Sequence, residues 1–290
     1  MTEATPAGRE DLEARSGSAT ALLRTVVGAV LRPIGGWMSA AGAVELMAAL
    51  DVPAPTARSS LARLCARGVL RREPRGGVAG YALDPAALPM LERGDRRIFG
   101  ARSPSDEWCL VSFSFPEHQR SRRHQLRTRL AALGCGTVAD GLWIGPAALE
   151  PELAEVAAAF GADLFTGARP AGDLRHGVAR WYDLPAIRAV HEAFLDRFGR
   201  AGEAATADGR EAFALWVRVL DEWRVLPYLD PGLPAAGLPD DWPGAASAAL
   251  FARLREALQE RAVAWAAGSA GDGGRVPGPT VESVPSPMRE

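Results

Sequence analysis

Residues 55–67, Pro-Thr-Ala-Arg-Ser-Ser-Leu-Ala-Arg-Leu-Cys-Ala-Arg, carry the clearest structural signal in the chain. Apolar residues recur there at helical spacing, so one face of a helix is expected to be buried. The opposite face carries hydroxyl and guanidinium groups. Hydroxyls permit close approach to phosphates, and an arginine can make two hydrogen bonds to guanine. Pro55 favours the first turn of a helix and Gly68 favours its end. The stretch therefore predicts a helix suited to lie against DNA.

The segments on either side of this helix complete a recognisable order. Apolar pairs recur every four residues through 19–31, and Ser39 can cap a second helix over 40–50. After Gly68, two short strands over 69–72 and 78–83 flank the turn Gly76-Gly77. Three helices followed by a basic hairpin are typical of a winged helix-turn-helix. The candidate DNA-binding residues are Thr56, Arg58, Ser59, Ser60, Arg63 and Arg67 on the helix, with Arg71, Arg72 and Arg75 on the wing.

Charge is distributed unevenly along the 290 residues. Residues 24–102 hold twelve arginines and six acids, a net charge of +6. Residues 140–290 hold fourteen arginines and twenty-two acids, a net charge of −8. A basic N-terminal part joined to an acidic C-terminal part indicates that the first part meets a polyanion.

The region over 104–184 alternates strands with helices. The segment 109–115 (CLVSFSF) is predicted as a strand, 119–133 as a helix and 136–144 as one or two strands. A helix over 152–160 and a strand over 162–166 follow, with a further strand over 178–182. This order favours a small ferredoxin-like α+β domain.

The remaining sequence is helical, with amphipathic segments near 186–199, 210–224 and 244–266. The predicted fold class is therefore multidomain α+β. A winged-helix domain spans 18–100, a ferredoxin-like domain 104–184 and a helical domain 185–266. Polar or Gly/Pro/Ser-rich tails at 1–17 and 267–290 are predicted to be disordered.

Several motifs in this order resemble the PaaX-type repressors of phenylacetate catabolism, over roughly residues 20–265. In the first domain they are Leu31-Arg32-Pro33 with Gly35-Gly36-Trp37, and Ala57-Arg58-Ser59-Ser60-Leu61-Ala62-Arg63-Leu64 with Gly68. In the middle they are Trp108, Phe113-Ser114-Phe115-Pro116-Glu117 and Gly141-Leu142-Trp143-Ile144. Near the end they are Glu222-Trp223-Arg224, Asp230-Pro231-Gly232-Leu233-Pro234 and Leu238-Pro239-Asp240-Asp241-Trp242-Pro243-Gly244.

The resemblance implies a homodimer that binds a double-stranded DNA operator and releases it when an acyl-CoA binds, phenylacetyl-CoA in the founding members. It also implies a middle domain shaped like the small CRISPR-associated endoribonucleases. Two positions depart from the family pattern: Asp221 stands where a histidine is expected, and Leu229 where an arginine is common. The effector of this chain can therefore differ from phenylacetyl-CoA.

An arginine-rich helix is the main candidate for the effector. Arg120, Arg122, Arg123 and Arg127 could hold the phosphates of a CoA. They could equally add contacts to DNA or form a solvated face. Trp223 and Arg224 are the other candidate effector-binding residues. The tryptophans at 216, 223, 242 and 265 line an acyl pocket or simply form the core.

Enzymatic alternatives find little support in the residues. A metal-dependent nuclease would need a carboxylate at the end of the strand over 109–115, and none stands there. A CoA-ester hydrolase would need a nucleophile and a base, and no serine elbow or P-loop occurs. The four histidines lack ligand spacing, and His191-Glu192 is predicted as a surface pair. We expect no enzyme activity, cofactor or metal.

Targeting signals are also absent from the sequence. No apolar run reaches the roughly 20 residues of a membrane span, and residues 1–18 do not resemble a signal peptide. The three cysteines show no disulfide or metal pattern. A cytoplasmic location is expected. A regulator without any effector remains an alternative to the acyl-CoA-responsive repressor.

Overall fold

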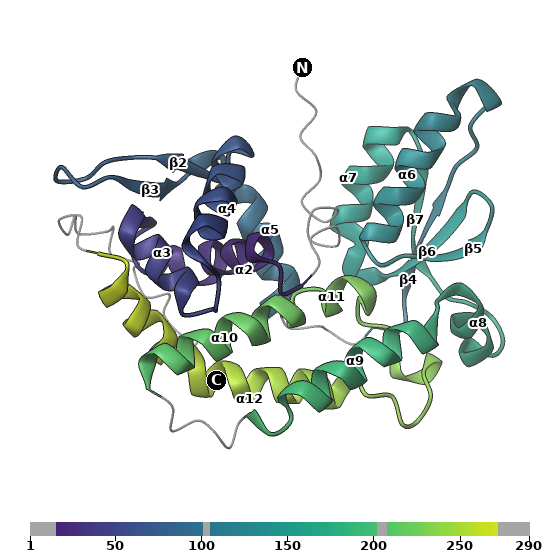
Figure 1. Cartoon of the computed structure of the whole chain (residues 1–290). Coiled ribbons are helices and arrows are strands. Elements are labelled where there is room, and N and C mark those ends of the chain that lie inside the picture. The colour runs from purple at the N-terminus through teal and green to yellow at the C-terminus, as the bar shows by residue number, and fades with distance from the viewer. Residues whose placement is uncertain (1–15, 101–104, 202–207, 272–290) are drawn as a thin grey trace, which may run out of the picture.

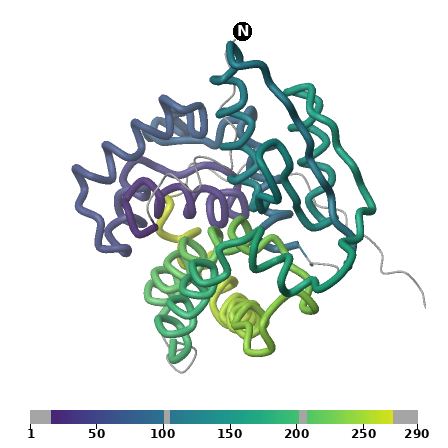
Figure 2. The backbone as a smooth tube through the Cα atoms, turned by 90° about the vertical axis from the view of Figure 1, so that its right-hand side faces the viewer, coloured from purple at the N-terminus to yellow at the C-terminus, as the bar shows by residue number. Residues whose placement is uncertain are grey.

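The computed structural model describes residues 16–100, 105–201 and 208–271. In Figure 1 the N-terminal part and the middle part stand side by side on a layer of C-terminal helices. Figure 2, turned by 90°, shows the same layer beneath both parts. The predicted tails fall mainly outside the described residues. However, the last helix continues to Ser269, beyond the predicted limit at 266.

The N-terminal part combines helices with a small sheet. Helix α2 (Ala19–Val26) runs on through a π-helical turn (Val27–Leu31), and α3 (Ala40–Ala48) and α4 (Ala54–Ala66) follow. Strands β1 (Trp37–Ser39), β2 (Leu70–Arg72) and β3 (Gly80–Leu83) pair antiparallel in the order β1-β3-β2. The three predicted helices and the hairpin are therefore present. Strand β1 was not predicted, because three residues give too short a pattern.

Local chemistry explains where these helices begin and end. The Ser39 hydroxyl accepts a hydrogen bond from Gly42 N at 2.9 Å, which caps α3 as predicted. Pro55 lies in the first turn of α4, and Gly68, with a φ of 69°, follows its end. Between α3 and α4, Asp51 has a φ of 61°. Its carboxylate accepts a hydrogen bond from Arg218 at 2.6 Å, which fixes the turn to a C-terminal helix.

An unpredicted helix, α5 (Leu88–Phe99), leads from the hairpin toward the middle part. Pro89 and Gly94 disguise it in the sequence, since both residues disfavour helix interiors. Asp84 caps the short turn before it, accepting from Ala86 N at 2.9 Å. Near its end, Arg97 donates to Pro227 O at 3.1 Å and to Leu133 O, and lies 3.5 Å from Glu152. Arg97 thereby joins three regions of the chain.

The middle part follows the order β4-α6-β5-β6-α7-β7. Strand β4 (Trp108–Ser112) is followed by α6 (Arg120–Ala132), β5 (Gly136–Ala139), β6 (Leu142–Pro146), α7 (Glu150–Phe160) and β7 (Asp163–Ala168). The four strands form an antiparallel sheet in the order β5-β6-β4-β7. Helices α6 and α7 pack on one of its faces through Leu126, Leu130 and Leu153.

Two expectations for this part need correction. The first strand ends at Ser112 rather than at 115, because Phe113 N turns to donate to Gly141 O at 2.9 Å. The segment 178–182 is not a strand but the end of α8 (Leu174–Trp181). The Asp173 side chain caps that helix by accepting from Arg175 N at 3.0 Å. A short apolar run does not distinguish a strand from a helix, and the cap decides here.

The C-terminal layer consists of α9 (Leu184–Phe198), α10 (Gly209–Trp223), the short α11 (Leu226–Leu229) and α12 (Gly244–Ser269). The three long helices match the predicted segments. Helix α10 packs along α12 and also against α2 of the N-terminal part. Buried side chains from α2, α3 and α4 form one continuous cluster with those of α9, α10 and α12. The C-terminal helices thus share a core with the N-terminal part.

Candidate nucleic-acid interface and ligand groove

Helix α4 presents two faces of opposite character. Ala57, Leu61 and Leu64 are buried, which fixes the helix against its neighbours. Exposed residues on its other sides are Thr56, Arg58, Ser59, Arg63 and Arg67. The Ser59 hydroxyl donates to Pro55 O at 3.1 Å. The exposed face therefore offers the guanidinium and hydroxyl groups expected from the sequence.

Ser60 does not belong to that face. Its side chain is only 1% exposed, and its hydroxyl lies 3.2 Å from that of Thr20 on α2. Thr20 also accepts a hydrogen bond from Arg63 Nη1 at 3.3 Å. Helical spacing predicted Ser60 on the polar face, but the packing of α2 along α4 covers this residue. Ser60 is thus a packing residue in this structure.

The hairpin carries less available positive charge than its sequence indicates. Its three arginines are Arg71, Arg72 and Arg75. The Glu73 carboxylate forms ion pairs with Arg71 and, at 2.8 Å, with Arg75. Arg75 also lies over the Trp37 ring, 5.5 Å from its centroid. Arg72 is exposed on β2 and has no carboxylate bonded to it in the described part of the chain.

The arginines of α6 make several contacts within the middle part. Arg123 lies 3.2 Å from Glu117, and Arg127 lies 3.8 Å from Asp140. Arg122 stacks over Phe115 with its guanidinium carbon 5.7 Å from the ring centroid. Arg120 is exposed. Acids and an aromatic ring of the middle part thus engage three of the four arginines that were predicted to bind the effector.

The structure does not bring the two halves of the predicted effector site together. Helix α6 lies on the sheet of the middle part, whereas Trp223 and Arg224 lie at the end of α10 in the C-terminal layer (Figure 1). Trp223 is buried and stacks on Phe251, with ring centroids 4.4 Å apart. The four arginines and the two residues at the end of α10 therefore lie in different parts of the structure.

Arg224 belongs to a buried polar cluster that sequence reasoning missed. Its Nε donates to the Asp221 carboxylate at 3.0 Å, and both residues are buried. Asp221 also accepts from Thr25 Oγ1 at 2.9 Å and from Gly17 N at 2.7 Å. Asp221, noted as a departure from the family pattern, thereby ties α10 to α2. No signal in the sequence links residues so far apart.

A groove opens beside Trp223, between the N-terminal part and the C-terminal layer. Its volume is about 810 Å³, and its walls come from the end of α5, the end of α10 and one side of α12. Ile98, Phe99, Trp223 and Phe251 supply much of the apolar lining. Arg255 lies over Phe99, 4.6 Å from the ring centroid, and donates to Gln259 at 2.8 Å. Of the predicted effector residues, only Trp223 lines this groove.

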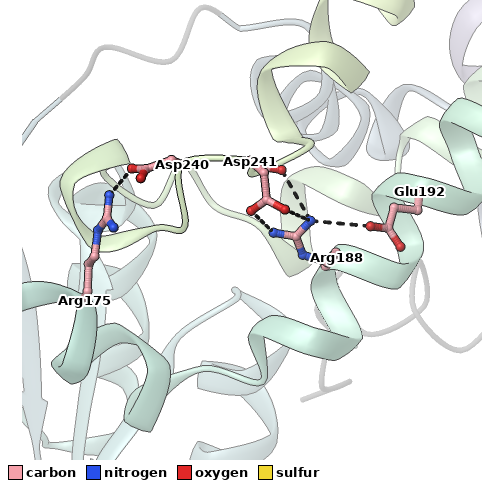
Figure 3. A network of polar contacts seen from close by, with 5 residues as sticks. All are labelled: Arg175, Arg188, Glu192, Asp240 and Asp241. Carbon is pink, nitrogen blue, oxygen red and sulfur yellow. Dashed lines mark hydrogen bonds and ion pairs between the residues drawn. The ribbon is translucent and has the colours of Figure 1, made fainter.

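The loop after α11 is anchored by polar contacts at two places. At the surface, Arg188 binds Asp241 at 2.7 Å and Glu192 at 3.5 Å, and Arg175 pairs with Asp240 (Figure 3). The hydrogen bonds from Arg188 lower the pKa of the Asp241 carboxyl. The ion pair therefore stabilises the fold at pH values above the ordinary pKa of an aspartate. This stabilisation is lost as the pH falls through the lowered pKa of Asp241.

The second anchor is the buried pair of His191 and Asp230, and it shows that the predicted surface position of His191 was wrong. His191 is 2% exposed rather than part of a surface pair, and its Nε2 lies 3.2 Å from Asp230. Asp230 also accepts from Trp242 Nε1 at 3.1 Å. Because Ile187, Phe194 and Phe198 share its face of α9, helical spacing could have placed His191 in the core.

Cys109 is buried and Cys135 is partly buried. Burial raises the pKa of the Cys109 thiol to about 11 and that of Cys135 to about 12. Within residues 16–100, 105–201 and 208–271, no three His, Cys, Asp or Glu side chains group to hold a metal ion. No helix in the same ranges combines the length and apolar character of a membrane span.

The chain is similar to a class of three-domain α+β proteins that have a small central sheet and a helical C-terminus. A family model described as PaaX-like protein matches residues 18–86. Models described as PaaX protein central Cas2-like domain and PaaX-like protein C-terminal domain match residues 101–174 and 182–268. The chain belongs to the PaaX family.

The chain is similar over most of its length to a solved structure. It is that of an uncharacterized protein, Rv0674, from Mycobacterium tuberculosis, with 25% sequence identity and a TM-score of 0.57. The match covers 83% of this chain and 97% of that one. Among curated proteins, none has a significant sequence match to this chain.

Proposed function

We propose that this protein is a sequence-specific DNA-binding transcriptional regulator whose N-terminal part is a winged helix-turn-helix. The observation that carries the proposal is α4, whose apolar face is fixed in the core while hydroxyls and arginines remain exposed on the other side. In this assignment α3 and α4 are the helix-turn-helix and α4 enters the major groove. Membership of the PaaX family points in the same direction, to a regulator rather than an enzyme.

The β2–β3 hairpin is the wing in this proposal. Arg72 is its outward cation, while Arg71 and Arg75 share Glu73. We therefore assign sequence reading to Arg63 and its neighbours on α4, and phosphate contacts to the wing. Phosphate contacts add affinity on any sequence, whereas base contacts discriminate between sequences.

The domain limits proposed are 18–100 for the winged helix, 104–184 for a ferredoxin-like domain and 185–266 for the helical domain. The order βαββαβ and the sheet order β5-β6-β4-β7 support the ferredoxin-like assignment. The shared core of α2 with α10 and α12 supports a second point, that the helical domain sets the position of the DNA-binding head.

We propose that the protein is a homodimer that represses transcription from its operator. Binding of an acyl-CoA releases the dimer from the operator. The proposed location is the reducing cytoplasm. Family membership is the support for the repressor, the dimer and the effector. The structure changes which residues serve the effector in this proposal. The α6 arginines, Arg120, Arg122, Arg123 and Arg127, lie apart from Trp223, so in this proposal they contact another part of the ligand rather than the acyl group.

The test begins with the purified full-length chain and a pool of random duplexes. Selection should enrich one sequence with two-fold symmetry, and half-sites should be centred about 10 base pairs, or a multiple, apart. Footprinting and sedimentation of the complex should then show a dimer on both half-sites. Failure to enrich any sequence would overturn the regulator proposal. A monomer on an asymmetric site would overturn only the dimer.

A further inference from the structure

We propose that the groove between α5, α10 and α12 holds the apolar acyl part of the effector, and that α2 transmits its occupancy to α4. This inference rests on the proposed function, because it assumes an acyl-CoA as effector. It adds the position of the site, the chemistry of its occupant and the path to the DNA-binding face.

The groove has the size and lining of a small-molecule site. A volume of about 810 Å³ lies within the range of roughly 300–1,000 Å³ that such sites occupy. Phe99, Trp223 and Phe251 form a wall of stacked rings, with Phe99 6.1 Å and Trp223 4.4 Å from Phe251 between centroids. Flat aromatic or alkyl groups gain most from such a wall.

The polar groups of the groove define the rest of the occupant. Arg255 supplies the guanidinium in the lining and can donate to a carbonyl oxygen. Glu256 and Glu260 also line the groove, and their charges oppose phosphate groups inside it. The acyl group therefore fits within the groove, with its carbonyl oxygen toward Arg255, and the CoA phosphates remain outside.

A connected set of contacts leads from this groove to α4. Trp223 Nε1 donates to Ile98 O at 3.2 Å, so the indole bridges α10 and α5 at the groove wall. Two residues earlier on α10, Asp221 accepts from Thr25 Oγ1 at 2.9 Å. Thr25 and Thr20 lie on the same helix, and Thr20 accepts from Arg63 Nη1 at 3.3 Å. A shift of the end of α10 is thereby carried through α2 to the arginine proposed to read DNA.

The thermodynamic requirement on this path is simple. An acyl-CoA releases DNA only if it binds the arrangement that is incompetent for DNA more tightly than the competent one. The groove has walls from both the N-terminal part and the C-terminal layer, so its shape depends on their relative position. Its occupant can therefore discriminate between two such arrangements.

The first experiment measures ligand binding without DNA. Ala252 lines the groove on the exposed side of α12, so Ala252→Phe fills it without entering the core. Phenylacetyl-CoA, benzoyl-CoA and hexanoyl-CoA are titrated by calorimetry. We expect the tightest binder to lose at least about tenfold in affinity, because the added ring occupies its place. Coenzyme A alone should bind more weakly than its esters.

Ala249→Phe is the matched control, an exposed alanine of the same helix outside the groove lining. It should bind the esters as the wild type does, and thermal unfolding should show both variants folded. The groove assignment is overturned if Ala252→Phe binds normally, if coenzyme A alone binds as tightly as its esters, or if none of the three esters binds.

The second experiment measures transmission. Thr25→Val removes the hydroxyl that reaches Asp221 and preserves the side-chain shape. Its ligand affinity should be unchanged, while the ratio of operator affinities without and with ligand should fall at least about threefold. Thr128→Val is the control, since the hydroxyl of Thr128 bonds back to His124 O at 2.9 Å as that of Thr25 bonds to Ala21 O at 3.1 Å.

The outcomes separate this inference from the proposed function. An unchanged ratio in Thr25→Val would overturn the path through α2. Operator release by an ester that still acts on Ala252→Phe would overturn the groove and leave the repressor intact. Absence of operator binding by the ligand-free wild type would overturn the proposed function, while calorimetry without DNA would still decide the groove.

Discussion

Helices α4 and α6 are both 13 residues long and both rich in arginine, yet their arginines are differently placed. On α6, Arg123 and Arg127 pair with acids, and Arg122 and Arg129 stack over aromatic rings. On α4, Arg63 contacts only a threonine hydroxyl among the described residues. Positive charge counted along a sequence is therefore not the charge available to a partner. Acids and rings brought close by the fold decide how much remains.

The largest predicted effect concerns what the two helices share, a firmly buried face. Leu64→Ala on α4 and Leu130→Ala on α6 should each lower the free energy of unfolding by about 2–5 kcal/mol, because each leaves a cavity at a residue no more than 1% exposed. Urea denaturation measures both. A loss below about 1 kcal/mol for Leu130→Ala would mean that α6 is held less firmly than α4, so that the two helices do not share a firmly buried face.

The second largest effect is expected from substitutions on the exposed faces of α4 and α6, which are predicted to differ in DNA binding. Arg63→Ala should weaken operator binding by about 1–3 kcal/mol and binding to random DNA much less, since Arg63 is proposed to read a base. Arg72→Ala on the wing should weaken both similarly. Fluorescence anisotropy with both duplexes gives the two affinities.

Arg123→Ala is the matched substitution on α6 and should change operator affinity less than about twofold, because Glu117 already engages that guanidinium. Equal losses for Arg63→Ala on operator and random DNA would remove Arg63 from base readout. A loss in Arg123→Ala as large as that in Arg63→Ala would place α6 in the DNA interface.

A smaller effect is expected where an acid reduces the charge of the wing. Glu73→Gln should free Arg71 and Arg75 and strengthen binding to random DNA. If one phosphate contact is gained, the slope of log affinity against log salt should steepen by about 0.9. A salt titration of wild type and variant on the same duplex measures this. An unchanged slope would show that the two arginines do not reach DNA even when free.

The smallest effect is predicted for the corresponding acid beside α6. Glu117→Gln releases Arg123 from an exposed ion pair, so the free energy of unfolding should change by less than about 0.5 kcal/mol. Operator affinity and its salt dependence should remain as in the wild type. A gain in DNA affinity matching that of Glu73→Gln would erase the proposed difference between the two helices.

The sequence by itself determined most of the local elements, although α5, α8 and β1 escaped it. Periodicity and caps placed α2, α3 and α4, the hairpin, the two helices on the middle sheet and the three long C-terminal helices. Periodicity and helix caps depend on residues that are close in the sequence, so they can be recognised without knowledge of the tertiary structure. The sequence also identified the apolar face of α4, because Ala57, Leu61 and Leu64 recur at helical spacing. The family motifs were likewise visible in order along the chain.

Only the tertiary structure decided which polar residues face solvent or one another. Ser60 is buried because α2 covers it, and His191 meets Asp230 from another part of the chain. Asp221 meets Thr25 from 196 residues away in the chain, and the groove has walls from separate regions. Local propensity carries no information about such contacts, since they depend on how helices pack once formed.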